Sequence, residues 1–190
     1  SFFTANIGLA FARAAIAGIW YTTEMPEVQV EERLLQLDMR LNIRYLRRTG
    51  QIQQYASSLR QGLSRLGQYR IIVNDTSAPD VGAISGQVMR LAEQHGIEYV
   101  IIDLLDHVSS EKYSDLSTAS EAHVMYQLKA MAKRANVAVI LVSHIAKQER
   151  ALRGKAVLDP EDMKGSSAKF QDADYSIGIM PVRWDIDKTD

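Results

Sequence analysis

The chain has 190 residues, of which 46% are hydrophobic, and its formal net charge at pH 7 is −1. This length is enough for one domain with a buried core, and no apolar run reaches the roughly 20 residues that cross a bilayer. Cysteine is absent, which excludes disulfides and thiolate metal sites and fits a cytoplasmic location. The small net charge excludes a protein that coats DNA with one basic face, so any contact with nucleic acid has to come from local loops.

The first third of the chain alternates between helix and strand patterns. Residues 3–17 are apolar and small, which predicts a helix packed on both sides, and the aromatic and β-branched residues 19–23 predict a short strand. Pro26 suits the start of a helix. Residues 51–66 predict a further single helix, which Gly67 would end.

The remaining pattern continues the alternation. The expected elements are strand 70–74, helix 80–95, strand 98–103, helix 114–135, strand 137–143, polar loop 145–170 and strand 174–181. Residues 137–143 are the most apolar of these, so we expect them to form the most buried strand. Continuous apolar strands separated by helices favour a parallel sheet covered on both faces, with right-handed crossovers. We therefore predict a single doubly wound α/β domain.

Three polar residues follow apolar strands, where ligands of such sheets bind. Asp103 has the Walker B arrangement and can hold Mg²⁺ beside phosphate, or it can be a helix N-cap or a loop acid. Glu24 can orient or deprotonate an attacking water near a γ-phosphate, or favour the dipole of the next helix. His144 can hydrogen-bond a terminal phosphate, or it can be a satisfied strand-end histidine.

The phosphate-binding pattern G-x-x-x-x-G-K-[ST] is missing. Ser1 precedes a predicted helix, so it can be the last residue of such a loop, with its hydroxyl meant for Mg²⁺, or it can be only the point where the sequence was cut. Residues 145–170 combine glycines with several cations. Such a segment can track a phosphate backbone or can be a solvated loop.

Several segments resemble, in order, those of DnaB-type replicative DNA helicases and the related phage primase-helicases. The segments are FFTANIGLAFA, TTEMPEVQVEERLL, IRYLRRTGQI, RIIVNDTSAPDVGAISGQVMRLAEQHG, YVIIDLLDHV, LKAMAKRANVAVILVSHIAK and DMKGSSAKFQDAD. No single string is diagnostic, but the shared order is specific. The resemblance implies a RecA-like P-loop NTPase core, with a mostly parallel twisted sheet and helices on both faces, spanning residues 1–190.

The resemblance also implies roles. Glu24 would be the catalytic glutamate, Asp103 the Walker B aspartate, His144 the γ-phosphate sensor, and Ser1 a ligand of the Mg²⁺ that accompanies ATP. The residues implied to contact single-stranded DNA in a central-channel loop are Lys164, Gly165 and Ser167. The expected assembly is a homo-hexameric ring, and contacts with primase and a helicase loader would fall in regions outside the chain.

The sequence also departs from the family pattern. The P-loop lysine is absent, so the chain by itself is expected to hydrolyse ATP poorly, and we expect it to be truncated at the P-loop and at the C-terminus. Asp106 replaces a glutamine, Ser167 replaces a glycine, and the arginine finger is expected beyond Asp190. Two other interpretations stay open: a plasmid replication helicase or RecA/RadA-type recombination ATPase, and a regulatory module without a P-loop.

Overall fold

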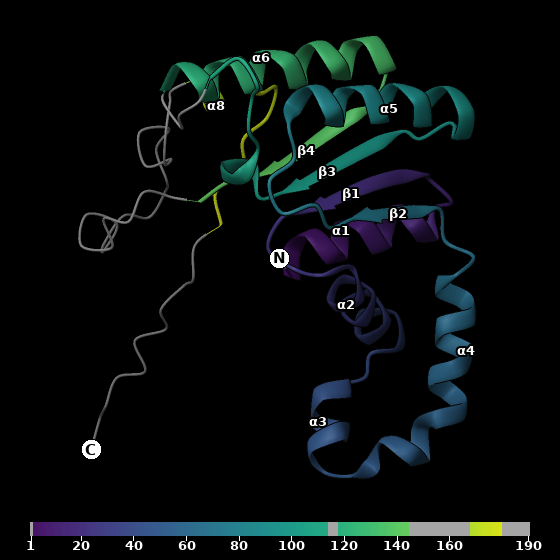
Figure 1. Ribbon diagram of the computed structural model, residues 1–190. Coiled ribbons are helices and arrows are strands. Elements are labelled where there is room, and N and C mark those ends of the chain that lie inside the picture. Colours follow the sequence, from purple (N-terminus) through teal and green to yellow (C-terminus); the bar gives the residue numbers. More distant parts are fainter. Residues whose placement is uncertain (1, 114–117, 145–167, 180–190) are drawn as a thin grey trace, which may run out of the picture.

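The computed structural model describes residues 2–113, 118–144 and 168–179, and these residues are organised around a parallel sheet (Figure 1). Its strands are β1 (Gly18–Thr22), β2 (Ile71–Asn74), β3 (Tyr99–Asp103) and β4 (Ala138–Val142), in the order β2-β1-β3-β4. Each neighbouring pair is parallel. This confirms the predicted α/β class and the predicted parallel sheet.

The central strands are the buried ones. Every residue of β1 and β3 is buried, whereas β4 is half-buried with Ala138 exposed. The expectation that the most apolar strand is also the most buried is therefore wrong. Within the described residues β4 lies at the edge of the sheet, so fewer elements cover it than cover the two strands in the middle.

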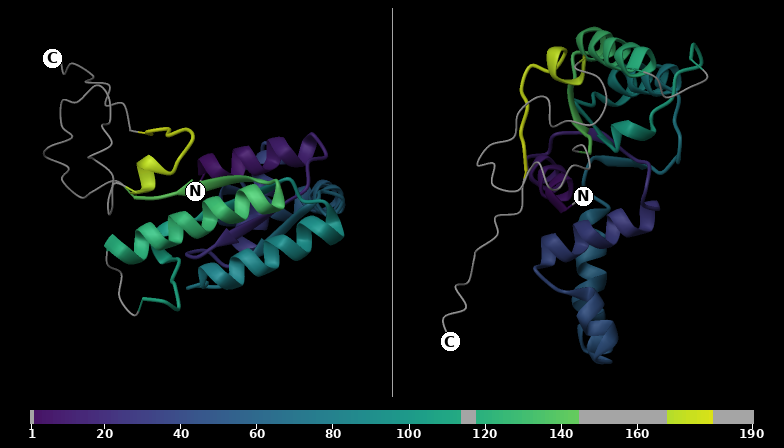
Figure 2. Two further views of the ribbon diagram at one scale, coloured as in Figure 1. Left: turned by 90° about the horizontal axis from the view of Figure 1, so that it is seen from above. Right: turned by 90° about the vertical axis from the view of Figure 1, so that its left-hand side faces the viewer.

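Helices cover both faces of the sheet, as predicted. α5 (Val81–His95) and α6 (Thr118–Ala135) lie on one face, and α1 (Phe2–Arg13) lies on the other with α2 (Glu27–Met39) beside it (Figures 1 and 2). Strand residues alternate between the two sides. Ile19 and Tyr21 join the core under α5 and α6, while Trp20 joins the core under α1 and α2.

Within the described part of the chain, the first helix is packed on one side only. Its buried residues form one stripe, at Thr4, Ala5, Gly8, Leu9 and Ala12. Phe2 and Phe3 at its start are 68% and 45% exposed. The prediction of a helix packed on both sides is therefore wrong, because an apolar sequence does not by itself reveal how many neighbours a helix has.

An arm of short helices extends away from the sheet below α2 (Figure 1). It contains α3 (Ile43–Arg48), the 3-10 helix η1 (Gln51–Tyr55) and α4 (Ala56–Leu66), so the single helix predicted over 51–66 is in fact divided. α4 packs on α2 at Gly62, where an added Cβ would lie 2.7 Å from Leu35 Cδ1. Gly67 ends α4, as predicted.

A buried carboxylate ties this arm to the sheet layer. Asp38, near the end of α2, accepts hydrogen bonds from Arg13 Nη2 at 2.8 Å, Arg65 Nε at 2.7 Å and the Tyr69 hydroxyl at 3.1 Å. Its side chain is only 3% exposed. One acid therefore joins the ends of α1, α2 and α4.

The second half of the chain follows the prediction closely up to β4. The Asp80 side chain accepts from the backbone N–H of Gly82 and caps α5, and Gly96 ends that helix in the left-handed conformation. α8 (Ala168–Gln171) begins within the expected polar loop and ends one residue beyond it. The described part of the expected last strand, 174–179, is not a strand. In the described part of the chain, no helix is both long and apolar enough to cross a membrane.

Candidate functional site at the carboxyl edge of the sheet

The strand register brings the predicted site residues to one edge. Thr22, the last residue of β1, pairs with Asp103 at the end of β3, and Asp103 pairs with Val142 at the end of β4. Glu24 and His144 each follow their strand by two residues and are exposed, while Asp103 is 5% exposed. The geometric expectation that these strand ends meet at one edge of the sheet is therefore confirmed. The chemical roles of the residues remain predictions.

The side chain of Asp103 is hydrogen-bonded to a residue of α1. The Thr4 hydroxyl donates to Asp103 Oδ2 at 3.0 Å, and Thr4 is completely buried. Sequence reasoning missed Thr4, although it stands as a polar residue on the otherwise apolar stripe of α1. A buried polar side chain requires a partner, so its position was a usable signal. The contact fixes the orientation of the Asp103 carboxylate relative to α1.

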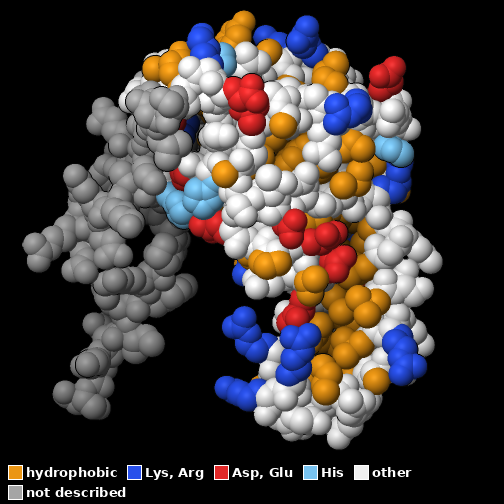
Figure 3. Space-filling model, in the orientation of Figure 1, with side chains coloured by type: hydrophobic (Ala, Val, Ile, Leu, Met, Phe, Trp, Pro, Cys, Tyr) orange, Lys and Arg blue, Asp and Glu red, His pale blue; other side chains and the backbone are white. Residues whose placement is uncertain are grey.

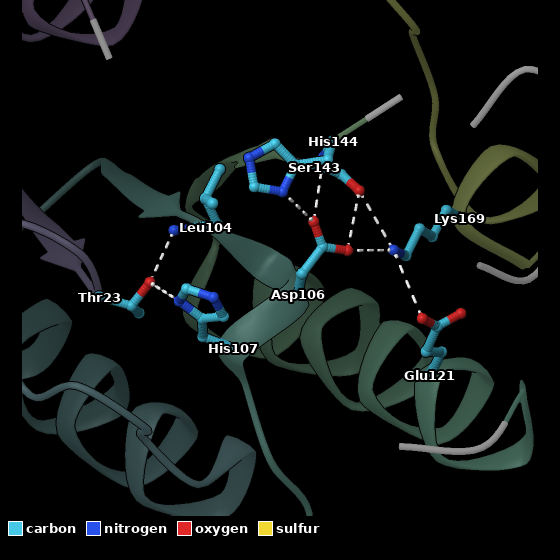
Figure 4. Close-up of polar contacts among 8 residues, drawn as sticks. All are labelled: Thr23, Leu104, Asp106, His107, Glu121, Ser143, His144 and Lys169. Carbon is cyan, nitrogen blue, oxygen red and sulfur yellow. Dashed lines mark hydrogen bonds and ion pairs between the residues drawn. The ribbon is translucent and has the colours of Figure 1, made fainter. Parts of the chain in front are cut away.

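Two threonines fix the turn that carries Glu24. Thr23 Oγ1 accepts from the Leu104 backbone N–H at 2.9 Å and lies 2.9 Å from His107 Nδ1 (Figure 4). The Thr23 hydroxyl can donate to Nδ1 when the ring proton is on the other nitrogen. On the preceding residue, Thr22 Oγ1 donates to the Met25 carbonyl at 3.0 Å. Glu24 therefore lies between Thr23, which is bonded to the residue after β3, and Met25, which is bonded to Thr22.

A second polar cluster lies at the end of β4, centred on Asp106 (Figure 4). Asp106 Oδ2 accepts from the His144 backbone N–H at 3.0 Å and lies 3.3 Å from His144 Nδ1. Asp106 Oδ1 accepts from Ser143 Oγ at 3.2 Å and from Lys169 Nζ at 2.7 Å. Lys169 also donates to Ser143 Oγ at 3.1 Å, and Glu121 Oε1 lies 3.6 Å from its Nζ.

Lys169 does not fit the solvated-loop interpretation of its segment. Its side chain is 2% exposed and that of Asp106 is 6% exposed. The lysine comes from α8 and the aspartate from η2 (Leu105–His107), 63 residues apart in sequence. No local pattern in the sequence predicts such a pair, although Asp106 is one of the positions that depart from the family pattern.

A basic cluster on α3, formed by Arg44, Arg47 and Arg48, lies away from this edge. Arginine side chains gather around α3 at the lower end of the molecule (Figure 3). Arg47 pairs with Glu32 at 2.7 Å, and the guanidinium of Arg48 lies 5.8 Å from the centre of the Tyr45 ring. These contacts account for part of the charge on α3.

The remaining predicted site residues, Ser1, Lys164, Gly165 and Ser167, lie outside the described residues. Among the described residues there is no group of three or more His, Asp or Glu side chains that would hold a metal by itself. A single strand-end carboxylate nevertheless fits Mg²⁺, because this ion is usually bound through one or two carboxylates together with substrate phosphates. Asp103 supplies an oxygen ligand of that kind.

Known proteins are similar to most of this chain. A model of the DnaB-like helicase C terminal domain family matches residues 1–185. The replicative DNA helicase DnaB of Rickettsia typhi is 26% identical over 161 residues, covering 84% of this chain and 32% of that protein. DnaB of Buchnera aphidicola subsp. Schizaphis graminum is 29% identical over 164 residues, covering 84% of this chain and 34% of that protein. The chain thus spans about a third of the length of these helicases.

Two solved structures share the fold. One, an ATPase domain, superposes with a TM-score of 0.77 at 19% identity, covering 91% of this chain and 62% of that one. A DnaB-like replicative helicase, studied for its interactions with primase, gives a TM-score of 0.81 at 19% identity, covering 92% and 42% respectively. The fold is the RecA-like α/β fold that the resemblance implied, and the chain belongs to the DnaB-like helicase C-terminal domain family.

Proposed function

We propose that this chain is the ATP-hydrolysing motor core of a replicative DNA helicase that works in the cytoplasm. The observation that supports this most directly is the gathering of the ends of β1, β3 and β4 at one edge, in a chain that matches the DnaB-like family over residues 1–185. Ligands of open α/β sheets bind at this edge, and the residues that follow the strands are of the types that phosphate chemistry needs.

Each of the three strand ends would contribute one residue to ATP hydrolysis. Asp103 would hold the Mg²⁺ that accompanies ATP, and this ion neutralises phosphate charge when it is bound. Glu24, exposed on its fixed turn, would orient or deprotonate the attacking water. His144, exposed beside Asp106, would contact the terminal phosphate and respond to its loss. Ser1 would complete the magnesium ligands as the end of a phosphate-binding loop.

The DNA contacts and the assembly are part of the same proposal. Single-stranded DNA would be followed by the main chain around Lys164, Gly165 and Ser167, which suits binding without reading of sequence. Six copies would form a ring with ATP between neighbours. One of the similar structures was studied with primase, and we propose that primase and a loader also contact the full-length form of this protein.

The test is single-strand-stimulated ATPase and fork unwinding by the full-length protein, with Glu24→Gln as the diagnostic variant. Loss of a general base typically lowers the rate by about 10²- to 10⁴-fold, so we expect that drop with ATP binding retained. Glu98→Gln is the matched control, because Glu98 is an exposed carboxylate at the opposite end of β3. Its ATPase should equal that of the wild type.

Three outcomes would contradict the proposal. They are an ATPase that single-stranded DNA does not stimulate, a Glu24→Gln variant as active as the Glu98→Gln control, and no binding of ATP at all. The last would favour a regulatory module without a phosphate-binding loop. Open filaments instead of closed rings in electron microscopy would favour a recombination ATPase.

A further inference from the structure

The Asp106–Lys169 pair is a buried charged contact beside the end of the edge strand β4. Both side chains are almost fully buried, and their Oδ1–Nζ distance is 2.7 Å. Taking two charges out of water is costly, and a pair of this kind is not by itself evidence for stability. The role of this buried ion pair therefore has to be sought in what it holds in place.

What the pair holds is the end of β4. Asp106 uses both carboxylate oxygens there, one on the Ser143 hydroxyl and the other on the backbone N–H of His144 and beside its ring Nδ1. Lys169 contacts Ser143 as well as Asp106. The backbone and the ring of His144 are thus oriented by one carboxylate, whose charge is balanced by a lysine from α8 (Figure 4).

We propose that Asp106 is the positioning residue for His144 and that Lys169 makes this positioning depend on where α8 lies. The inference rests on the proposed function, in which His144 contacts the terminal phosphate. A displacement of α8 changes the Lys169–Asp106 contact, and Asp106 in turn changes the orientation of His144. Coupling between two sites is reciprocal, so the nucleotide state that His144 meets also acts on α8.

A second ion pair joins the same segment to the body of the molecule and supplies a control. Lys129 on α6 pairs with Asp174, which follows α8, at 2.6 Å. Asp174 is exposed and Lys129 is partly buried, and neither residue has a contact with Asp106 or His144 among those of the described residues. Removing the pair takes away a contact of Asp174, three residues after the end of α8, and leaves every contact of the His144 cluster in place.

The experiment measures kcat and KM for ATP, with and without a single-stranded DNA oligonucleotide, in the full-length protein. Lys169→Met is the test, Lys169→Arg the conservative rescue and Lys129→Met the control. We expect Lys169→Met to reduce the DNA stimulation of kcat by about 5-fold or more, the lower end of typical allosteric coupling. The effect on KM should be smaller, Lys169→Arg should restore most of the stimulation, and Lys129→Met should match the wild type.

A double-mutant cycle decides whether Lys169 acts through His144. If it does, adding Lys169→Met to His144→Ala removes little further stimulation, because the two changes interrupt one network. Should Lys169→Met fail to fold, Asp106→Asn combined with Lys169→Met removes both charges of the buried pair together. This double variant is also expected to lose the stimulation.

The inference is overturned if DNA stimulates Lys169→Met, or the folded double variant, as strongly as the wild type. It is equally overturned if the losses from Lys169→Met and His144→Ala multiply independently. A failure of the proposed function looks different, because the wild-type protein itself would then show no ATPase stimulated by single-stranded DNA.

Discussion

Replacing Asp38 by asparagine tests how the arm of short helices is attached to the layer formed by the sheet and α1. The carboxylate accepts hydrogen bonds from Arg13, Arg65 and Tyr69 while only 3% exposed. Breaking a fully buried ion pair costs about 3–5 kcal/mol. Here the two arginine side chains are about half exposed and can return to water, so we expect a loss of about 2–4 kcal/mol in the free energy of unfolding.

The effect should depend on pH in a defined direction. Burial opposes ionisation of Asp38, but the hydrogen bonds from Arg13, Arg65 and Tyr69 outweigh it, so the pKa of this carboxyl is lowered. The stabilisation is then complete above the pKa of an unfolded aspartate, about 3.9, and is lost as the pH falls through the lower folded value. The difference between the wild type and Asp38→Asn should therefore be constant near neutrality and shrink in acid.

Urea unfolding over a pH series measures this difference. Glu31→Gln is the control, because Glu31 is an exposed carboxylate on the same helix and should change the stability little. The reasoning is refuted if Asp38→Asn costs no more than Glu31→Gln at neutral pH. It is also refuted if the cost of Asp38→Asn persists undiminished in acid.

Two further predictions concern the packing around Tyr99. Burial raises the pKa of Tyr99 to about 12, and its hydroxyl is one of the buried side-chain atoms in the described residues that lack a hydrogen-bond partner. Tyr99→Phe should therefore raise the free energy of unfolding by about 1 kcal/mol, and it should remove the loss of stability expected as the pH rises from about 10 towards the folded pKa. Unchanged or lower stability in urea unfolding would contradict this. Gly18→Ala should instead destabilise by about 1–3 kcal/mol, because its Cβ would lie 2.5 Å from Tyr99 Cδ1; an unchanged melting temperature would contradict that expectation.

The sequence predicts much of the sheet because an apolar run that ends in a polar residue is typical of a buried parallel strand. Asp103 ends the apolar run YVII, and parallel pairing then carries the ends of the neighbouring strands to the same edge. The caps of α5 were equally readable, since Asp80 and Gly96 are typical residues at the start and end of a helix. These features depend on short stretches of sequence and on general rules of chain geometry.

The contacts between distant segments were not predictable. Asp106 and Lys169 meet only because η2 and α8 pack together, and Lys169 lies among glycines and cations that suggest a solvated loop. The division of 51–66 into η1 and α4 was also missed, since periodicity reports which residues are apolar and not where a helix changes its hydrogen bonding. The burial of β4 was also wrongly predicted, because it depends on the strand order of the whole sheet and not on how apolar the strand is.

The position of β4 at the edge of the described sheet bears on how the motor would signal. β1 and β3 are buried along their whole length, so Asp103 cannot shift without disturbing the core, which suits a residue that holds a metal ion. β4 is half-buried, and polar contacts to Asp106 hold its end. Polar contacts of this kind can be exchanged for contacts with another polar partner, whereas the loss of buried apolar packing leaves a cavity. We therefore expect a change in the bound nucleotide to shift the end of β4 and α8. The central strands β1 and β3 are expected to keep their positions.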